Sequence, residues 1–157
     1  MYSHQIERIL QHQLKSEFIG VFAKDQLPVN PQGGMVVNTA RAEEPGKHWI
    51  VMVFKGARGE YFDSFARPPV GVFASYMKTY APRGWTYNQQ RLQGTRTAVC
   101  GAYCILYLLH RQDGQKMMDL IQRLFTKNTR ANDLRVCTAM QRRFGLHLPL
   151  VDNFARS

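Results

Sequence analysis

The chain has 157 residues, of which 45% are hydrophobic and 20% are charged, which predicts a globular domain with a full core. We therefore expect one domain over residues 1–157. No apolar run is long enough to span a bilayer, and the polar N-terminus does not resemble a secretory signal. The three cysteines do not suggest a disulfide framework, so we expect a reducing compartment.

The net charge of +10 lies mostly in the C-terminal half. Residues 1–77 hold 8 Lys/Arg and 7 Asp/Glu, whereas residues 78–157 hold 13 and 4. This asymmetry favours an anionic partner, with nucleic acid as the first candidate. A solvated basic surface without a ligand is the alternative, and no recognisable nucleic-acid-binding motif decides between the two.

In chain order, the sequence predicts helix, then strands, then helices. We expect a first helix capped by Ser3, then an irregular segment over residues 18–28. Four strands are expected over residues 35–40, 48–54, 60–65 and 85–93. Further helices are expected over residues 72–80, 98–109, 115–125 and from Asn132 to Gly145. This order predicts an α+β fold, with a central, mostly antiparallel sheet and segregated helices.

The strongest predicted strand is HWIVMVF, over residues 48–54, which is apolar on both faces and therefore central. A turn containing Gly56 and Gly59 joins it to the returning strand, so the pair should form a hairpin. His48 opens the first strand and Asp63 lies near the end of the second, which places both at the open end. A carboxylate there can orient an imidazole and stabilise its positive charge.

Cys100 lies at the start of an apolar segment, so we expect this thiol in the first turn of a buried helix. The positive end of the helix dipole favours a thiolate. Gln93, seven residues upstream, carries an N–H donor for a developing oxyanion. With His48 and Asp63, these residues make a complete set for acyl transfer. Each has an alternative, since a lone cysteine is commonly a buried small hydrophobe and the others are ordinary strand-end or turn residues.

Four segments, in order, resemble the adenovirus maturation protease (adenain) family of viral cysteine proteases. These segments are FIGVFAKDQLP, VVNTARAEEPGKHW, YFDSF and QGTRTAVCGAYC. The resemblance implies the fold of SUMO-specific (Ulp-type) proteases, a papain-like core with permuted order. It assigns His48 as the base, Asp63 as its orienting acid, Cys100 as the nucleophile and Gln93 as the oxyanion donor. Trp49 then becomes a substrate-binding wall over a narrow channel.

The resemblance also implies a biological role. It implies a thiol endopeptidase that cleaves capsid and core precursors at Gly-containing sites during virion maturation. We expect non-specific DNA as a further partner, no membrane, a monomeric chain, and a location in the virion and the infected cell, in its nucleus or a cytoplasmic virus factory. Two alternatives stay open: a protease for ubiquitin-like modifiers, and a non-catalytic basic nucleic-acid-binding module on the same fold.

For cofactors, we expect no metal or organic group, and the resemblance points to activation by DNA or a viral peptide. In adenain, a cysteine upstream of the oxyanion glutamine forms a disulfide with the activating peptide. This chain has no cysteine between His48 and Cys100, which argues against activation by that covalent route.

Overall fold

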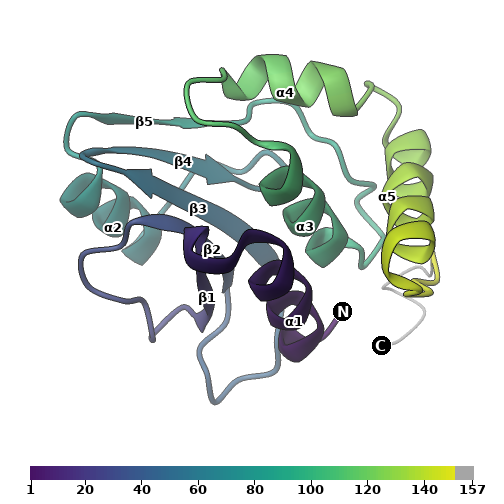
Figure 1. Cartoon of the computed structure of the whole chain (residues 1–157), viewed down its shortest axis with the longest axis horizontal. Helices are drawn as coiled ribbons and strands as arrows, with labels where there is room; N and C mark the ends of the chain where they lie inside the picture. Colours follow the sequence, from purple (N-terminus) through teal and green to yellow (C-terminus); the bar gives the residue numbers. More distant parts are fainter. Residues whose placement is uncertain (151–157) are drawn as a thin grey trace.

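The computed structural model describes residues 1–150, so the last seven residues of the expected domain lie outside the described part. Its centre is a five-stranded sheet in the order β1-β2-β3-β4-β5 (Figure 1). The strands are β1 (Phe18–Ala23), β2 (Gly33–Asn38), β3 (Trp49–Lys55), β4 (Arg58–Phe62) and β5 (Gly84–Tyr87). The three inner strands pair antiparallel, and each edge strand pairs parallel with its neighbour.

Helices cover both faces of this sheet (Figure 1). They are α1 (Ser3–Leu14), α2 (Val72–Tyr80), α3 (Cys100–His110), α4 (Met117–Leu124) and α5 (Thr129–Phe144), with a short 3-10 turn over Lys15–Glu17. The α2 helix packs on one face, and α1 and α3 pack on the other, with α4 and α5 beyond α3. The predicted α+β fold is confirmed, but the sheet is antiparallel only among its three inner strands, and helices lie on both of its faces.

The side chains of β3 divide the core into two layers. Val51 and Val53 face the layer that contains α3, whereas Ile50, Met52 and Phe54 face the layer that contains α2. Successive strand residues point to opposite faces, so a strand that is covered on both sides must be apolar throughout. This explains the continuous apolar run from which the central position of this strand was predicted.

Several predicted boundaries were wrong. Residues 18–23 form the edge strand β1 and not an irregular segment, and the last strand ends at Tyr87. Tyr2, not Ser3, occupies the N-cap of α1. The cap of α5 is Asn128, whose side chain accepts from the Ala131 amide.

Two further findings concern the described residues as a whole. No helix within residues 1–150 has the length and apolar character needed to cross a membrane. Cys100, Cys104 and Cys137 are all free thiols.

Candidate active site

His48 and Asp63 meet at the end of the β3–β4 hairpin, as the hairpin register requires. Val51 pairs with Phe62, so His48 precedes β3 and Asp63 follows β4 at the same open end. The His48 Nε2 atom lies 2.7 Å from Asp63 Oδ1, and both side chains are buried. The second ring nitrogen, Nδ1, is therefore left for a partner on the other side of the imidazole.

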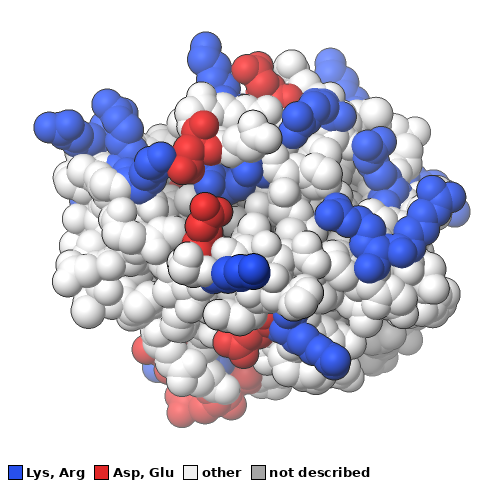
Figure 2. All heavy atoms as spheres, viewed as in Figure 1, with Lys and Arg blue, Asp and Glu red and all other residues white. Residues whose placement is uncertain are grey.

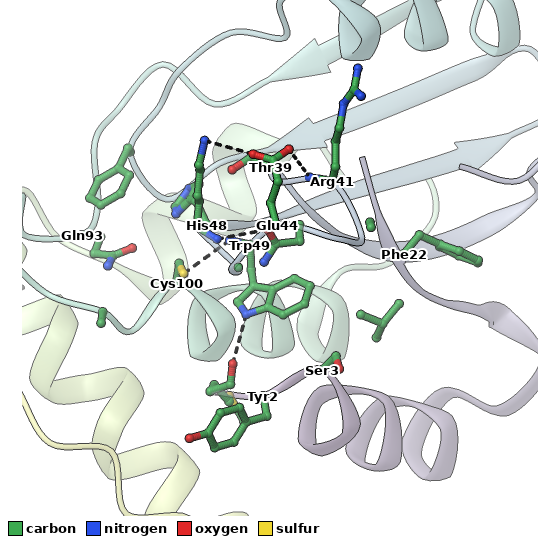
Figure 3. A pocket seen from close by; sticks show the side chains of 18 of the residues that line it. Tyr2, Ser3, Phe22, Thr39, Arg41, Glu44, His48, Trp49, Gln93 and Cys100 are labelled. Atoms are coloured by element: carbon green, nitrogen blue, oxygen red, sulfur yellow. Dashed lines mark hydrogen bonds and ion pairs between the residues drawn. The ribbon is translucent and has the colours of Figure 1, made fainter. Parts of the chain in front are cut away.

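That partner is the thiol of Cys100, the first residue of α3 (Figure 3). The His48 side chain interacts electrostatically with the thiol, and the backbone N–H of Trp49 donates to Sγ at 3.4 Å. The first backbone N–H groups of a helix have no intrahelical acceptor and carry partial positive charge. The thiol thus lies among groups that stabilise a thiolate.

The acid–base properties of this pair differ from those of isolated side chains. Burial opposes charge on both groups, but the hydrogen bonds with Asp63 and Cys100 outweigh it and raise the pKa of His48 to about 9. Burial also opposes a Cys100 thiolate, yet the hydrogen bond and charge of His48 leave the pKa of Cys100 below its usual value. Both shifts favour a thiolate–imidazolium pair, which can attack a carbonyl carbon, over the neutral pair.

Gln93 lies in the same site, and both the oxygen and the nitrogen of its side-chain amide form hydrogen bonds within the protein. Ser64 Oγ donates to Oε1 at 2.6 Å. Nε2 donates to the Thr97 carbonyl at 2.9 Å and to Thr97 Oγ1 at 3.3 Å. A substrate oxyanion at Cys100 would have to compete with Thr97 for this donor.

A cleft of about 1140 Å³ opens over these residues, and His48, Trp49, Gln93 and Cys100 line it. The Trp49 indole points toward the N-terminal segment, where Nε1 donates to the Met1 carbonyl at 3.2 Å (Figure 3). The predicted wall residue is therefore at the cleft and is held in place by the segment before α1.

Gly101, directly after Cys100, allows this segment to approach the cleft. A Cβ at Gly101 would lie 3.1 Å from Met1 Cβ and 3.3 Å from Ile6 Cδ1. These are tight contacts with the start of α1, so a larger side chain would push that helix away from α3.

Three supporting residues were missed in the sequence. The Phe65 ring stacks on the His48 imidazole, with centroids 4.8 Å apart. Asn88 accepts from the Asp63 amide at 3.0 Å and donates to the Asp63 carbonyl at 2.6 Å, so it fixes the acid through its backbone. Asp133, on α5, binds the loop between Gln93 and Cys100. Phe65 is two residues from Asp63, but Asn88 and Asp133 are 25 and 39 positions from the residues that they bind, so spacing could not identify these two.

Within residues 1–150, no group of three or more His, Cys, Asp or Glu side chains could hold a metal ion.

No protein-family model matches this chain, and no curated protein matches it. Five solved chains match. One is "Crystal Structure of ASFV pS273R protease", which is 20% identical, with a TM-score of 0.57, over 86% of this chain and 65% of that chain. A selenomethionine structure of that protease is 25% identical, with a TM-score of 0.47, over 71% of this chain and 44% of that chain. The first likeness shows a common fold, and this chain spans about two thirds of the length of that protease.

Proposed function

We propose that this chain is a cysteine endopeptidase with Cys100 as its nucleophile. The observation that carries the proposal is the position of the His48 ring, which lies 2.7 Å from the Asp63 carboxylate and interacts with the Cys100 thiol. Thiol, imidazole and carboxylate in this order form a nucleophile, a base and an orienting group. The fold that this chain shares with the ASFV protease supports the proposed peptidase function.

In the proposed reaction, the Cys100 thiolate attacks the peptide carbonyl carbon, and the oxygen becomes an oxyanion. The Cys100 backbone N–H and the Gln93 amide are the proposed donors to this oxyanion. The His48 imidazolium then gives its proton to the leaving amine as the C–N bond breaks. Water, deprotonated by His48, attacks the thioester, which releases the acid and restores the thiolate.

The resting contacts of Gln93 add a step to this scheme. Because Nε2 donates to Thr97, binding of the substrate carbonyl must draw this amide away from Thr97 or share it. Ser64 keeps Oε1 as an acceptor throughout, so the amide presents only its N–H groups to the cleft. We propose that Ser64 and Thr97 are the residues that set the availability of the oxyanion donor.

The substrates we propose are virion precursor proteins with Gly at the cleaved bond, processed during particle maturation. This rests on the resemblance to the adenain family and on the half-buried Trp49 that lines the cleft. The proposed setting is the virion and the infected cell. DNA or a non-covalent peptide is the proposed activator, because no cysteine is present between His48 and Cys100 to bind a peptide by a disulfide.

Two other functions would use the same fold. A protease for ubiquitin-like modifiers would use the same residues, and a non-catalytic module would use only the basic half of the chain. The interactions of the His48 imidazole with the Asp63 carboxylate and the Cys100 thiol favour an enzyme, because a binding module does not require them.

The test is a hydrolysis assay with three sets of substrates: Gly-containing virion precursors, SUMO conjugates and ubiquitin conjugates. We expect cleavage of the precursors, and no cleavage by Cys100→Ala, which serves as the matched control. Preferential cleavage of conjugates would favour the modifier protease. Absence of hydrolysis in all three sets, with and without DNA, would overturn the proposal.

A further inference from the structure

The cleft beside Cys100 carries an excess of positive side chains. Four cations line it: Arg41, Lys47, Arg67 and Arg91. Among the described residues that line it, Glu44 is the one carboxylate, and it lies 3.8 Å from Lys47 Nζ. The three arginines form no ion pair with any carboxylate of residues 1–150. The cleft therefore has positive charge that the described protein does not neutralise.

One of these arginines is held close to the catalytic base. The Phe65 ring stacks on the His48 imidazole at 4.8 Å, and the Arg67 guanidinium lies 5.1 Å from the centre of the same ring. Two turn contacts fix the segment: Phe65 N–H donates to Asp63 Oδ1 at 2.8 Å and Ala66 N–H donates to the Asp63 carbonyl at 2.8 Å. The position of Arg67 is thus tied to the residue that orients His48.

The direction of proton transfer in the reaction indicates which half of the substrate would lie near Arg67. In acyl transfer the imidazolium gives its proton to the leaving amine, so the leaving half of the substrate passes on the imidazole side of the thiol. Phe65 is stacked on that imidazole, and Arg67 lies over the Phe65 ring. A substrate residue shortly after the cleaved bond would therefore come within reach of the Arg67 guanidinium, which suits a carboxylate.

We propose that the cleft selects polypeptides with an acidic residue on the leaving side of the cleaved bond, and that Arg67 is the residue that determines this preference. The proposal deepens the proposed peptidase function and rests on it. The neighbouring Arg41 and Arg91 add to the same field, so the preference extends to acidic segments on both sides of the bond. Opposite charge in a cleft also raises the encounter rate with such substrates.

The first experiment compares two peptides that differ only in having Glu or Lys after the cleaved bond. We expect kcat/KM to favour Glu by about fivefold at low salt, the upper value for an exposed ion pair. Arg67→Glu should reverse the preference, and Arg67→Gln should abolish it. Arg83→Glu, an exposed charge reversal near β5, is the matched control and should leave the preference unchanged. An unchanged preference in Arg67→Glu would overturn the proposal.

A second experiment needs no hydrolysis and so separates this proposal from the peptidase function. The rates of Cys100 alkylation by anionic iodoacetate and by neutral iodoacetamide are measured. The rate with iodoacetate divided by the rate with iodoacetamide reports the local electrostatic potential. Arg67→Glu should lower the ratio, Arg83→Glu should not, and added salt should reduce the difference. A ratio that Arg67→Glu leaves unchanged would refute the proposed field. A lowered ratio in a protein that cleaves no peptide would instead refute the peptidase function.

Discussion

Two cysteines one helical turn apart on α3 have opposite acid–base properties. The pKa of Cys104 is well above its usual value, because full burial disfavours a thiolate there. Cys100 is also buried, but it has the His48 imidazole as a partner, and its pKa is lowered. Burial alone therefore does not decide the reactivity of a thiol in this helix, and the partner does.

We predict that Cys100→Ala abolishes hydrolysis, by a factor of at least about a thousand, and leaves the fold intact. Cys104→Ala should retain activity and lower the free energy of unfolding by about 1 kcal/mol, the cost of a small cavity in the core. Hydrolysis rates and urea denaturation of both variants measure these effects. Near-normal turnover in Cys100→Ala would contradict the assignment of the nucleophile.

The pH dependence of the reaction follows from the same pair. Below the lowered pKa of Cys100 the thiol is protonated, and above about pH 9 His48 loses the proton that the leaving amine needs. We therefore predict that kcat/KM falls above about pH 9. Asp63→Asn removes one of the groups that raise the pKa of His48, so the alkaline limb should move to lower pH and the rate should fall. A limb that stays in place would argue against Asp63 as the orienting acid.

At the level of elements, the hairpin and the start of α3 could be predicted because their signals are local. The apolar run of β3 and the turn containing Gly56 fixed the pairing that brings His48 to Asp63. β1 was missed because its parallel pairing with β2 is non-local and contains a register shift between Phe18 and Gly20. Parallel neighbours are joined by long connections, and no short turn motif marks them in a sequence.

The loop before α3 shows what the sequence could not predict at the site. Asp133, from α5, accepts from the Gly94 amide at 3.2 Å, from Thr97 Oγ1 at 3.2 Å and from the Tyr103 hydroxyl at 2.7 Å. These contacts join residues 30 or more positions apart in the chain. A helix remote in sequence thus holds the loop that carries Thr97, the resting partner of Gln93.

We predict that Asp133→Ala impairs both stability and catalysis. Its three donors would lose a buried acceptor, which should cost about 1–3 kcal/mol for each donor left unsatisfied. The released loop should also lower kcat more than it raises KM, because the oxyanion donor becomes misplaced. Asp119→Asn, at an exposed site on α4, is the control. Thermal unfolding and steady-state kinetics separate the two effects, and an unchanged kcat would limit Asp133 to a role in folding.

At the scale of the whole molecule, α5 carries more positive than negative charge. Figure 2 shows Lys and Arg side chains over the region of α4 and α5, at the top and right of that view. The exposed arginines of α5 are Arg130, Arg135, Arg142 and Arg143. Charges spread along one helix suit contacts with phosphates more than the reading of bases, which requires a cluster of side chains directed into a groove.

We predict that this surface binds DNA without sequence preference. The logarithm of the binding constant should then fall linearly with the logarithm of the salt concentration, with a slope of about −0.9 for each phosphate neutralised. Replacing Arg135, Arg142 and Arg143 with Gln should reduce the slope and weaken binding to unrelated duplexes equally. The control replaces three exposed residues outside α5, Arg58, Lys78 and Arg83, with Gln. It removes the same number of positive charges and should change the slope less. Titration of two labelled duplexes at several salt concentrations measures this. Binding that salt does not weaken, or equal effects of both triple variants, would mean that α5 is not the DNA-binding surface.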